Sequence, residues 1–266
     1  MKEKTQNLNA QSLGIKSSVI IIAAGRGKRM AALTNDKPKC MLKFGDKTLL
    51  QHQQEAYSAC GIKKISVVRG YKSETIDYHG ITYFENTDYE NNNILVSLMC
   101  AEQALNGHVI CAYSDILFSA SVVQKVLEST YDISIVVDVD WRDYYEGREN
   151  HPLEEAENII FDETKKVISA GKIMADKNDI HGEFIGMIKF TPSGAEKFKQ
   201  HFHSVKKKYK GKSFQRANVF EQAYLTDIIQ DMADEGIHIH CVTIERGWKE
   251  IDTIEDYEKA LENFEG

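Results

Sequence analysis

A short apolar run that ends in a glycine-rich turn constrains the fold of this chain more than any other feature. Residues 18–24 read Ser-Val-Ile-Ile-Ile-Ala-Ala, and residues 25–27 continue with Gly-Arg-Gly. A continuous stretch of β-branched, apolar residues is typical of a strand buried on both faces, as in a parallel sheet. Glycines directly after such a strand let backbone N–H groups approach a ligand without a Cβ atom in the way. The run therefore predicts a buried parallel strand that feeds a phosphate-binding loop.

Strand and helix patterns alternate along the rest of the chain. Helices are predicted at residues 49–60, 94–105, 121–129, 193–206, 217–235 and 254–264, and further strands at 65–68, 81–84, 108–113, 133–139, 184–190 and 237–244. This alternation predicts a three-layer α/β/α fold with a mostly parallel, Rossmann-like central sheet, whose ligand crevice lies beyond the carboxyl ends of the strands. Gly25, Gly70 and Asp115 each follow a predicted strand, so we expect them at that crevice.

The chain divides into a tail, one domain and an insertion. Residues 1–16 are polar and lack the apolar core of a signal peptide, which predicts a flexible tail. Residues 17–266 contain enough apolar side chains for a single large α/β domain. Within it, residues 141–182 are charged and irregular, with hairpin strands predicted at 159–161 and 167–173. This segment predicts a small inserted subdomain that builds part of a ligand pocket.

Composition narrows the class of partner. The chain carries 33 Lys and Arg against 40 Asp and Glu, a net charge of −7, so its overall field repels nucleic acid and anionic membranes. Its 5 cysteines lack the spacing of metal ligands, which predicts reduced thiols and a cytoplasmic protein. A phosphate site must therefore be a local cluster of cations. The oligomeric state stays open, a homodimer included.

Such a cluster follows the glycine loop. Residues 26–29 contain three cations, and Lys37 and Lys39 flank Pro38 about a dozen residues later. Proline fixes its own φ and biases the preceding residue toward an extended backbone, which would aim both lysines in defined directions. The loop lacks the third glycine of the dinucleotide fingerprint and the GK[ST] ending of the P-loop. It therefore predicts a phosphate cradle of another kind.

From Ile20 to Leu42 the sequence resembles the nucleotidyltransferase (nucleotide-diphospho-sugar transferase) superfamily, whose signature is a strand, (L/I)AAGxGxRM and then KP. The resemblance implies a GT-A-like fold and a bound nucleoside triphosphate. The predicted nucleotide-binding residues, strand-end positions included, are Ala23, Ala24, Gly25, Arg26, Gly27, Lys28, Arg29, Gly70 and Ser114. The resemblance also implies that Arg29 contacts the phosphates and that Lys37 or Lys39 neutralises charge at the α-phosphate.

Two aspartates are candidate metal ligands. Asp115 directly follows the strand predicted at 108–113, and Asp252 stands just before the last predicted helix. Mg²⁺ takes oxygen ligands and needs only one or two carboxylates when substrate phosphates complete its shell. In the resembled superfamily these two positions hold the catalytic Mg²⁺ together. Alternatively, Asp115 is a turn residue and Asp252 a helix N-cap, and the Asp138-Val139-Asp140 pattern would suit a glycosyltransferase.

The middle of the chain indicates an acceptor. Residues 144–157, 182–186 and 223–230 resemble the phosphocholine-type cytidylyltransferases, most of all the branch that acts on phosphonates such as 2-aminoethylphosphonate. The resemblance implies CTP and a small phosphonate or phosphate as substrates, with residues 141–182 on the acceptor side. The predicted acceptor-binding residues are Arg148, His151, Tyr145, Glu183, Asn92 and Trp248.

These acceptor residues have structural alternatives. Arg148 could grip two phosphonate oxygens, or could instead pair with a neighbouring glutamate. Tyr145 and Trp248 could face an amine or could be packed in the interior, and an asparagine near Asn92 could cap a helix.

The implied reaction is an in-line attack of the anionic acceptor oxygen on CTP with release of pyrophosphate, which needs no general base. Two alternatives stay open: a phosphocholine or other small-phosphate cytidylyltransferase, and a nucleotide sensor without activity. Loss of the aspartates or of the lysines would favour the sensor, and this chain has both sets.

Overall fold

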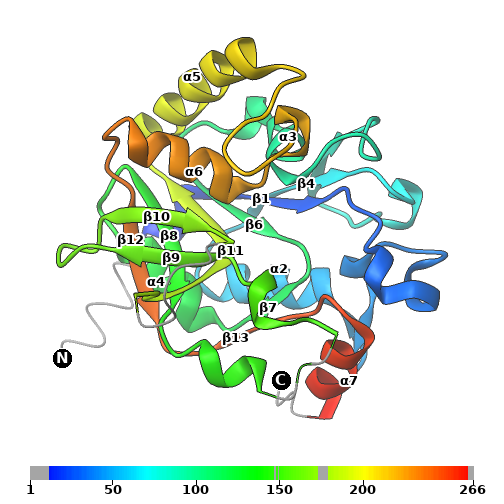
Figure 1. Ribbon diagram of the computed structural model, residues 1–266. Helices are drawn as coiled ribbons and strands as arrows, with labels where there is room; N and C mark the ends of the chain where they lie inside the picture. Colours follow the sequence, from blue (N-terminus) through cyan, green and yellow to red (C-terminus); the bar gives the residue numbers. More distant parts are fainter. Residues whose placement is uncertain (1–11, 147, 149, 173–178, 263–266) are drawn as a thin grey trace.

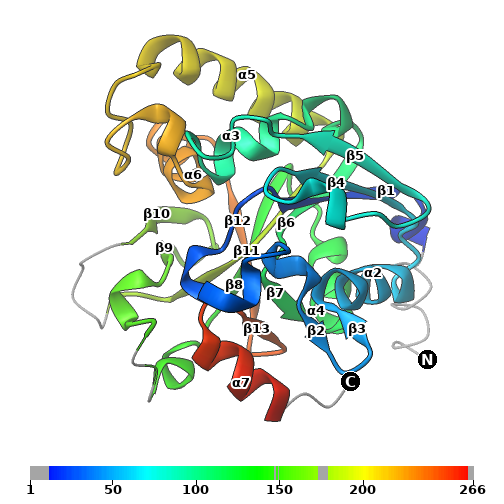
Figure 2. The same cartoon turned by 90° about the vertical axis from the view of Figure 1, so that its right-hand side faces the viewer.

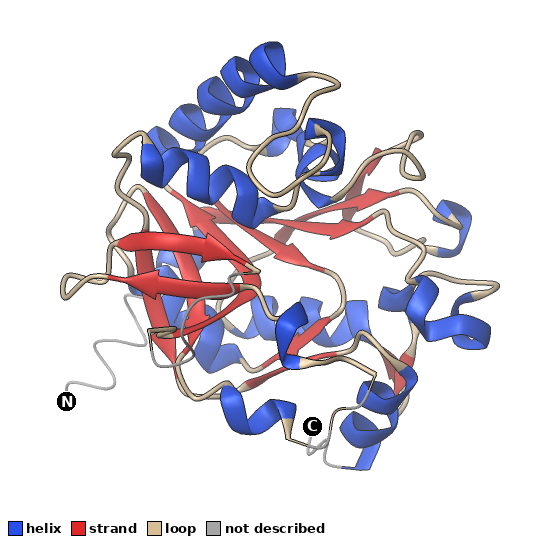
Figure 3. Cartoon of the chain, viewed as in Figure 1, coloured by secondary structure: helices blue, strands red, loops and turns tan. Residues whose placement is uncertain are grey.

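A mixed sheet flanked by helices on both faces forms the centre of the protein (Figures 1 and 3). The computed structural model describes residues 12–146, 148, 150–172 and 179–262. Within these residues the sheet has 9 strands, in the order β10-β9-β11-β6-β1-β4-β5, with β8 beside β11 and β12 beside β8. The expected three-layer α/β/α fold is confirmed.

The first strand lies inside the sheet, as its sequence predicts. All seven residues of β1 (Ser17–Ala23) are buried, and β1 pairs in parallel with β4 (Lys64–Arg69) and β6 (His108–Tyr113). On the far side of β4, β5 (Ile81–Glu85) continues the parallel arrangement. Because parallel strands end at the same edge, the residues that follow β1, β4 and β6 emerge together there.

One strand reverses the direction of the sheet. Strand β11 (Gly182–Phe190) runs antiparallel to β6, β8 (Ile133–Asp138) and β9 (Asn158–Phe161). Its register against β8 shifts between Phe184 and Ile188, around Gly186, whose φ of +80° is the left-handed region that favours glycine. The hairpin of β9 and β10 (Val167–Gly171) and the parallel pair of β8 with β12 (His240–Ile244) complete the sheet.

Helices cover the two faces of the sheet (Figure 2). Alternate residues of β1 point to opposite sides: Val19 and Ile21 pack with α2 (Leu49–Ala59) and α4 (Ala120–Glu128). Ile20 and Ile22 pack in the cluster that includes α3 (Ile94–Met99), α5 (Pro192–Tyr209) and α6 (Leu225–Asp234). The period of two in strand geometry thus divides one apolar run between two cores.

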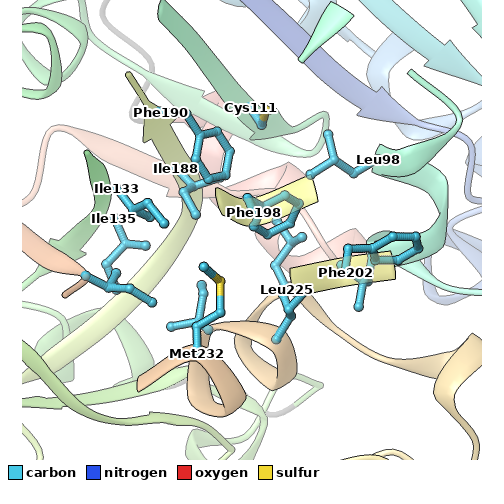
Figure 4. Close-up of a cluster of buried hydrophobic side chains, with 14 of the residues drawn as sticks. Leu98, Cys111, Ile133, Ile135, Ile188, Phe190, Phe198, Phe202, Leu225 and Met232 are labelled. Atoms are coloured by element: carbon cyan, nitrogen blue, oxygen red, sulfur yellow. The ribbon is translucent and has the colours of Figure 1, made fainter. Parts of the chain in front are cut away.

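The second of these cores is rich in aromatic rings (Figure 4). Phe198 and Phe202 of α5 point toward the sheet together with Leu225 of α6. Phe198 is fully buried, and its ring centroid lies 4.9 Å from that of Phe190 on β11.

A third, smaller cluster joins the segment after the glycine loop to α7 (Ile254–Glu262) through buried Met30, Leu117 and Ile251.

Short elements link the larger ones. Short 3-10 helices occupy Lys28–Thr34 (η1), Lys39–Met41 (η2), Ser73–Thr75 (η3), Glu102–Ala104 (η4), Arg142–Tyr145 (η5), Leu153–Glu155 (η6) and Phe220–Gln222 (η7). Two small antiparallel pairs join β2 (Lys43–Phe44) with β3 (Lys47–Thr48), and β7 (Ile116–Phe118) with β13 (Trp248–Glu250). None of the described helices combines the length and apolar composition needed to cross a bilayer.

Two predicted helices are longer than the observed ones. The helix predicted at 94–105 ends at Met99, and the one predicted at 217–235 begins at Leu225. Buried side chains such as Leu105 and Phe220 continue the apolar pattern through η4 and η7, so the pattern alone overestimated both lengths. Of the tail predicted at residues 1–16, residues 1–11 lie outside the described residues, as do position 173 of the hairpin and the end of the last helix. Residues 12–15 are helical, and the Ser17 hydroxyl donates to the Leu13 carbonyl over 2.8 Å.

Truncation of Phe198 should test the aromatic core. Because Phe198 is fully buried, Phe198→Ala should lower the free energy of unfolding by about 3–5 kcal/mol, which denaturant titration measures. Ile168→Ala on β10 is the matched control, since Ile168 is 55% exposed and its loss should cost less than about 1 kcal/mol. Equal effects of the two variants would contradict this description of the core.

Candidate active site

A pocket opens at the carboxyl ends of β1 and β6, at the edge that the sequence predicts. Its described lining residues are Ile22, Gly25, Gly27, Arg29, Lys39, Asn93, Ile94, Tyr113, Ser114, Asp115, His151, Glu155, Glu157, Lys172, Tyr224, Glu250 and Asp252. Seven positions predicted for catalysis, the nucleotide or the metal, including both aspartates, are therefore brought together. Residues from the insertion and from the last third of the chain supply the opposite wall.

The glycine loop and Lys39 are packed against each other. Gly27 has a φ of +67°, and a Cβ atom at this position would lie 2.5 Å from Cγ of Lys39. A glycine is thus required both by the left-handed backbone and by the close approach of the lysine. The Thr34 hydroxyl donates to the Gly27 carbonyl over 3.1 Å, which links the loop to the end of η1.

Lys39 is the lysine that enters the pocket. Its ammonium lies 3.1 Å from Oδ2 of Asp115 and also contacts Oδ1 of Asp252. Burial by itself would lower the pKa of Lys39, but the two aspartates outweigh burial and raise it, so the group stays charged. Lys37 is 40% exposed, lies 3.8 Å from Asp36, and is not among the described lining residues.

A pair of three-residue strands brings the two aspartates together. In the antiparallel pairing of β7 with β13, Ile116 is opposite Glu250, and the Ile251 amide donates to the Asp115 carbonyl over 2.8 Å. Asp115 and Asp252 therefore flank the same end of this ribbon. Sequence analysis did not predict either strand.

The charges around Asp252 are balanced within the site. Arg29 lies on η1, and its Nη1 is 2.7 Å from Oδ2 of Asp252, while Lys39 contacts the other oxygen. Burial would raise the pKa of Asp252, but Lys39 and Arg29 outweigh it and hold the pKa below its usual value. The carboxylates of Asp115 and Asp252 lie close enough for the Lys39 nitrogen to contact both. They therefore fit a divalent cation that prefers oxygen ligands.

Three further carboxyl groups line the pocket, those of Glu155, Glu157 and Glu250, and sequence analysis named none of them as a site residue. Glu157 accepts hydrogen bonds from Tyr113 Oη at 3.1 Å and Thr226 Oγ1 at 2.7 Å, and desolvation raises its pKa to about 7. Desolvation also raises the pKa of Glu250 to about 7, with Asp252 adding to the effect. Glu157 lies in residues 144–157 and Glu250 stands two residues before Asp252, so both belong to segments that the sequence analysis considered, but only the fold places them in the pocket.

Charged side chains from the insertion and the glycine loop also line the pocket and pair with each other. Glu155 of η6 contacts the Lys172 ammonium, and its Oε2 is 4.0 Å from Nη1 of Arg29. The Lys172 ammonium lies 5.3 Å from the centre of the Tyr224 ring. The insertion and the glycine loop thus meet through ion pairs.

Arg148 lies behind the pocket wall instead of in it. Its side chain is 2% exposed, Nε donates to Asp256 at 2.9 Å, and Nη2 donates to His151 Nδ1 at 2.9 Å. Because an arginine can only donate, a neutral His151 carries its proton on Nε2. His151 lines the pocket as predicted, but the expected contact of Arg148 with an acceptor is corrected to a buried ion pair with Asp256.

Burial would raise the pKa of Asp256, yet its interactions with His151 and Arg148 hold it well below its usual range. The same carboxylate accepts from the backbone N–H groups of Asp252 and Thr253, at 3.2 and 2.9 Å. Arg148 and Asp256 therefore tie the insertion to the backbone of a candidate metal ligand.

The remaining acceptor candidates also have internal partners. Tyr145 is buried and donates to Glu183, and desolvation together with Glu250 raises the pKa of Glu183 to about 8. The buried Trp248 donates from Nε1 to Asp138 at 2.7 Å. These three predicted contacts, Tyr145, Glu183 and Trp248, are not among the described lining residues, because packing and hydrogen bonds direct them inward.

Asn92 Oδ1 accepts a hydrogen bond from Asn86 Nδ2 at 2.7 Å, and Asn92 is not among the described lining residues of the pocket. Its neighbour Asn93 does, and it caps α3 by accepting from the Ile94 amide at 2.9 Å.

Asp138, weighed as part of an alternative metal motif, is fully buried and accepts from Arg246 at 2.9 Å as well as from Trp248. Its carboxylate oxygens therefore bind side chains in the interior and do not face the pocket.

The other loop positions form the back of the cradle. Ala23 and Ala24 are buried, and the Tyr71 amide donates to the Ala24 carbonyl over 2.9 Å. Gly70 packs so closely that a Cβ atom would lie 2.6 Å from that same carbonyl oxygen. The Arg26 guanidinium lies 5.4 Å from the centre of the Tyr71 ring, and Lys28 is exposed at the start of η1.

Removal of Arg148 should reveal its buried pairing. Arg148→Met should lower the free energy of unfolding by about 3–5 kcal/mol, because it leaves Asp256 as an uncompensated buried charge. Arg148→Met combined with Asp256→Leu should cost less than the sum of the single variants in denaturant titrations. Arg26→Met, at an exposed arginine, is the control. Wild-type stability of Arg148→Met would rule out the pairing.

Comparisons with known proteins show which family the chain belongs to. The sequence profile described as the MobA-like NTP transferase domain matches residues 19–174. The chain is 28% identical to CTP:phosphoglutamine cytidylyltransferase from Campylobacter jejuni, over 92% of this chain and 99% of that relative. It is 32% identical to 2-aminoethylphosphonate cytidylyltransferase from Lancefieldella rimae, but over 39% of this chain and 45% of the relative.

A solved structure shares the fold. The CTP:phosphocholine cytidylyltransferase from Streptococcus pneumoniae superimposes with a TM-score of 0.69 and 20% sequence identity, covering 93% of this chain and 98% of that one. The family profile includes the strand, the glycine loop, Lys39, Asp115 and most of the insertion. The chain is a nucleotidyltransferase and belongs to the MobA-like NTP transferase domain family.

Proposed function

We propose that this protein is a magnesium-dependent cytidylyltransferase that transfers CMP from CTP to a small phosphorus oxyacid and releases pyrophosphate. The observation that carries the proposal is the meeting of the glycine loop, Lys39, Asp115 and Asp252 in one pocket. Support for CTP in particular comes from the relative that matches over nearly the whole chain, which is a CTP:phosphoglutamine cytidylyltransferase.

Positioning and charge neutralisation account for the proposed catalysis. An acceptor phosphate or phosphonate is anionic at neutral pH, so its oxygen can attack the α-phosphorus in line without a general base. Nucleotidyl transfer of this kind gains most of its acceleration from fixed geometry and from neutralisation of the phosphate oxygens. Lys39 and Arg29 supply positive charge on the loop side of the pocket. A Cβ atom at Gly25 would have no neighbour within 4 Å, which leaves room for the phosphates.

Asp115 and Asp252 are the residues that would hold the magnesium ion. Both offer carboxylate oxygens, which are hard ligands, and Mg²⁺ commonly combines one or two of these with substrate phosphates. A magnesium ion bound there would neutralise phosphate oxygens of the nucleotide. The expected nucleotide and metal residues remain proposals that this arrangement supports.

The acceptor side of the pocket favours a substrate with both an oxyanion and an amine. Lys172 can bind the oxyanion. Glu157 and Glu250 have pKa values of about 7 because of desolvation, and an ammonium group beside them would favour their ionised forms. Phosphoglutamine, 2-aminoethylphosphonate and phosphocholine, the substrates named for similar proteins, all carry a nitrogen group and a phosphorus oxyanion.

The sequence favours a phosphonate acceptor, whereas the relative matched over nearly its whole length acts on phosphoglutamine. We therefore infer a small amine-bearing phosphorus oxyacid, with phosphoglutamine and 2-aminoethylphosphonate as the first candidates.

The two lysines should differ sharply in importance. Lys39→Met should lower kcat by about two decades or more, because Lys39 is the lysine whose charge lies inside the pocket. Lys37→Met is the matched control and should change kcat by less than about threefold. Steady-state pyrophosphate release measures both. A Lys37 effect as large as that of Lys39 would return the catalytic role to Lys37.

A substrate panel tests the function directly. Pyrophosphate release should be fastest with CTP among the four NTPs and should depend on one of phosphoglutamine, 2-aminoethylphosphonate and phosphocholine. Glucose 1-phosphate, which lacks an amine, should be a poor acceptor. A preference for glucose 1-phosphate would overturn the acceptor assignment, and CTP binding without turnover on any acceptor would favour a nucleotide sensor.

A further inference from the structure

The contacts of Lys39 place a positive charge where a metal ion would need to bind. Its ammonium lies 3.1 Å from Asp115 and contacts Asp252, so one nitrogen bridges the two candidate metal ligands. The side chains of Lys39 and Asp252 are only 10% and 4% exposed. Water therefore screens this arrangement poorly, and the attraction is stronger than in a surface ion pair.

The charges of the four side chains that contact one another at this position are already balanced. Asp115 and Asp252 carry two negative charges, and Lys39 and Arg29, which contact them, carry two positive charges. A divalent cation added to this cluster by itself would leave a sheltered site with excess positive charge. The cation must therefore displace Lys39, or an additional anion must arrive with it.

Lys39 is placed so that it can exchange partners. Its aliphatic stem runs along Gly27, where a Cβ atom would lie 2.5 Å from Cγ and 2.7 Å from Cε. The ammonium is therefore close to the loop that is shaped to hold phosphates. A triphosphate on the loop would offer Lys39 and Arg29 new anionic partners, since charge-assisted bonds to phosphate are strong for both side chains.

We propose that Lys39 is an internal counter-cation that competes with a divalent metal ion for Asp115 and Asp252, so that the nucleotide and the metal bind cooperatively. The inference rests on the proposed metal role of these two aspartates. Lys39 holds the carboxylates together without nucleotide and moves to the phosphates when the triphosphate binds. By linkage, whatever draws Lys39 away strengthens metal binding, and metal binding strengthens nucleotide binding by the same factor.

The test measures Mn²⁺ binding to the full-length protein without nucleotide or acceptor, by electron paramagnetic resonance of free Mn²⁺. Lys39→Met should bind Mn²⁺ about tenfold or more tightly than wild type, because the competing charge is gone. Lys37→Met removes a charge from the same segment without contact to the aspartates and should leave Kd unchanged within about twofold. Adding Asp115→Asn to Lys39→Met should abolish the gain.

A second variant and a second measurement allow for altered stability. Lys39→Gln keeps a hydrogen-bond donor near the aspartates and should also tighten Mn²⁺ binding. Mn²⁺ should raise the Tm of both Lys39 variants more than that of wild type, since the ion replaces the missing charge and binds the folded state.

Equal Mn²⁺ affinity and equal Tm shifts in wild type and in both variants would overturn the inference, even for an enzyme with the proposed activity. Absence of pyrophosphate release with every NTP would instead overturn the proposed function, because the Mn²⁺ titration contains no nucleotide.

Discussion

The contact of one lysine with two aspartates is the interaction on which the rest of the site depends. Lys39 comes from the segment after the glycine loop, Asp115 from the end of β6, and Asp252 from the segment before α7. Two carboxylates that contact the same ammonium would repel each other in a sheltered pocket if that cation were absent. The ammonium therefore stabilises the geometry that we propose for metal and nucleotide binding.

The buried ion pair of Arg148 with Asp256 supports the contact of Lys39 with Asp252. Asp256 accepts from Arg148 of the insertion and from the backbone amide of Asp252, so it connects the insertion to a candidate metal ligand. His151 lies between this pair and the pocket. A change in the insertion can thus alter the position of Asp252 without touching the nucleotide. Polar contacts of this kind make the pocket one unit, although its walls come from distant parts of the chain.

The sequence predicts the elements whose signals are local. The strand at 18–24, the glycine loop and the lysines stand close together, and their pattern indicated both the sheet and the phosphate cradle. Strands β7 and β13 escaped prediction because three residues are too few to show a period. The burial of Arg148 also could not be predicted, since its partner Asp256 lies 108 residues away in a separate helix.

The same division explains why the reaction class is easier to identify than the acceptor. The loop side of the pocket, from Gly25 to Lys39, is one continuous segment, so a short motif describes its chemistry. The proposed acceptor side is assembled from Tyr113, Glu157, Lys172, Tyr224 and Glu250, each on a different segment. Single substitutions at these positions can change the charge of the wall while the sheet and the loop stay unchanged. Acceptor specificity can therefore diverge within one fold, and the acceptor must be inferred from contacts in space.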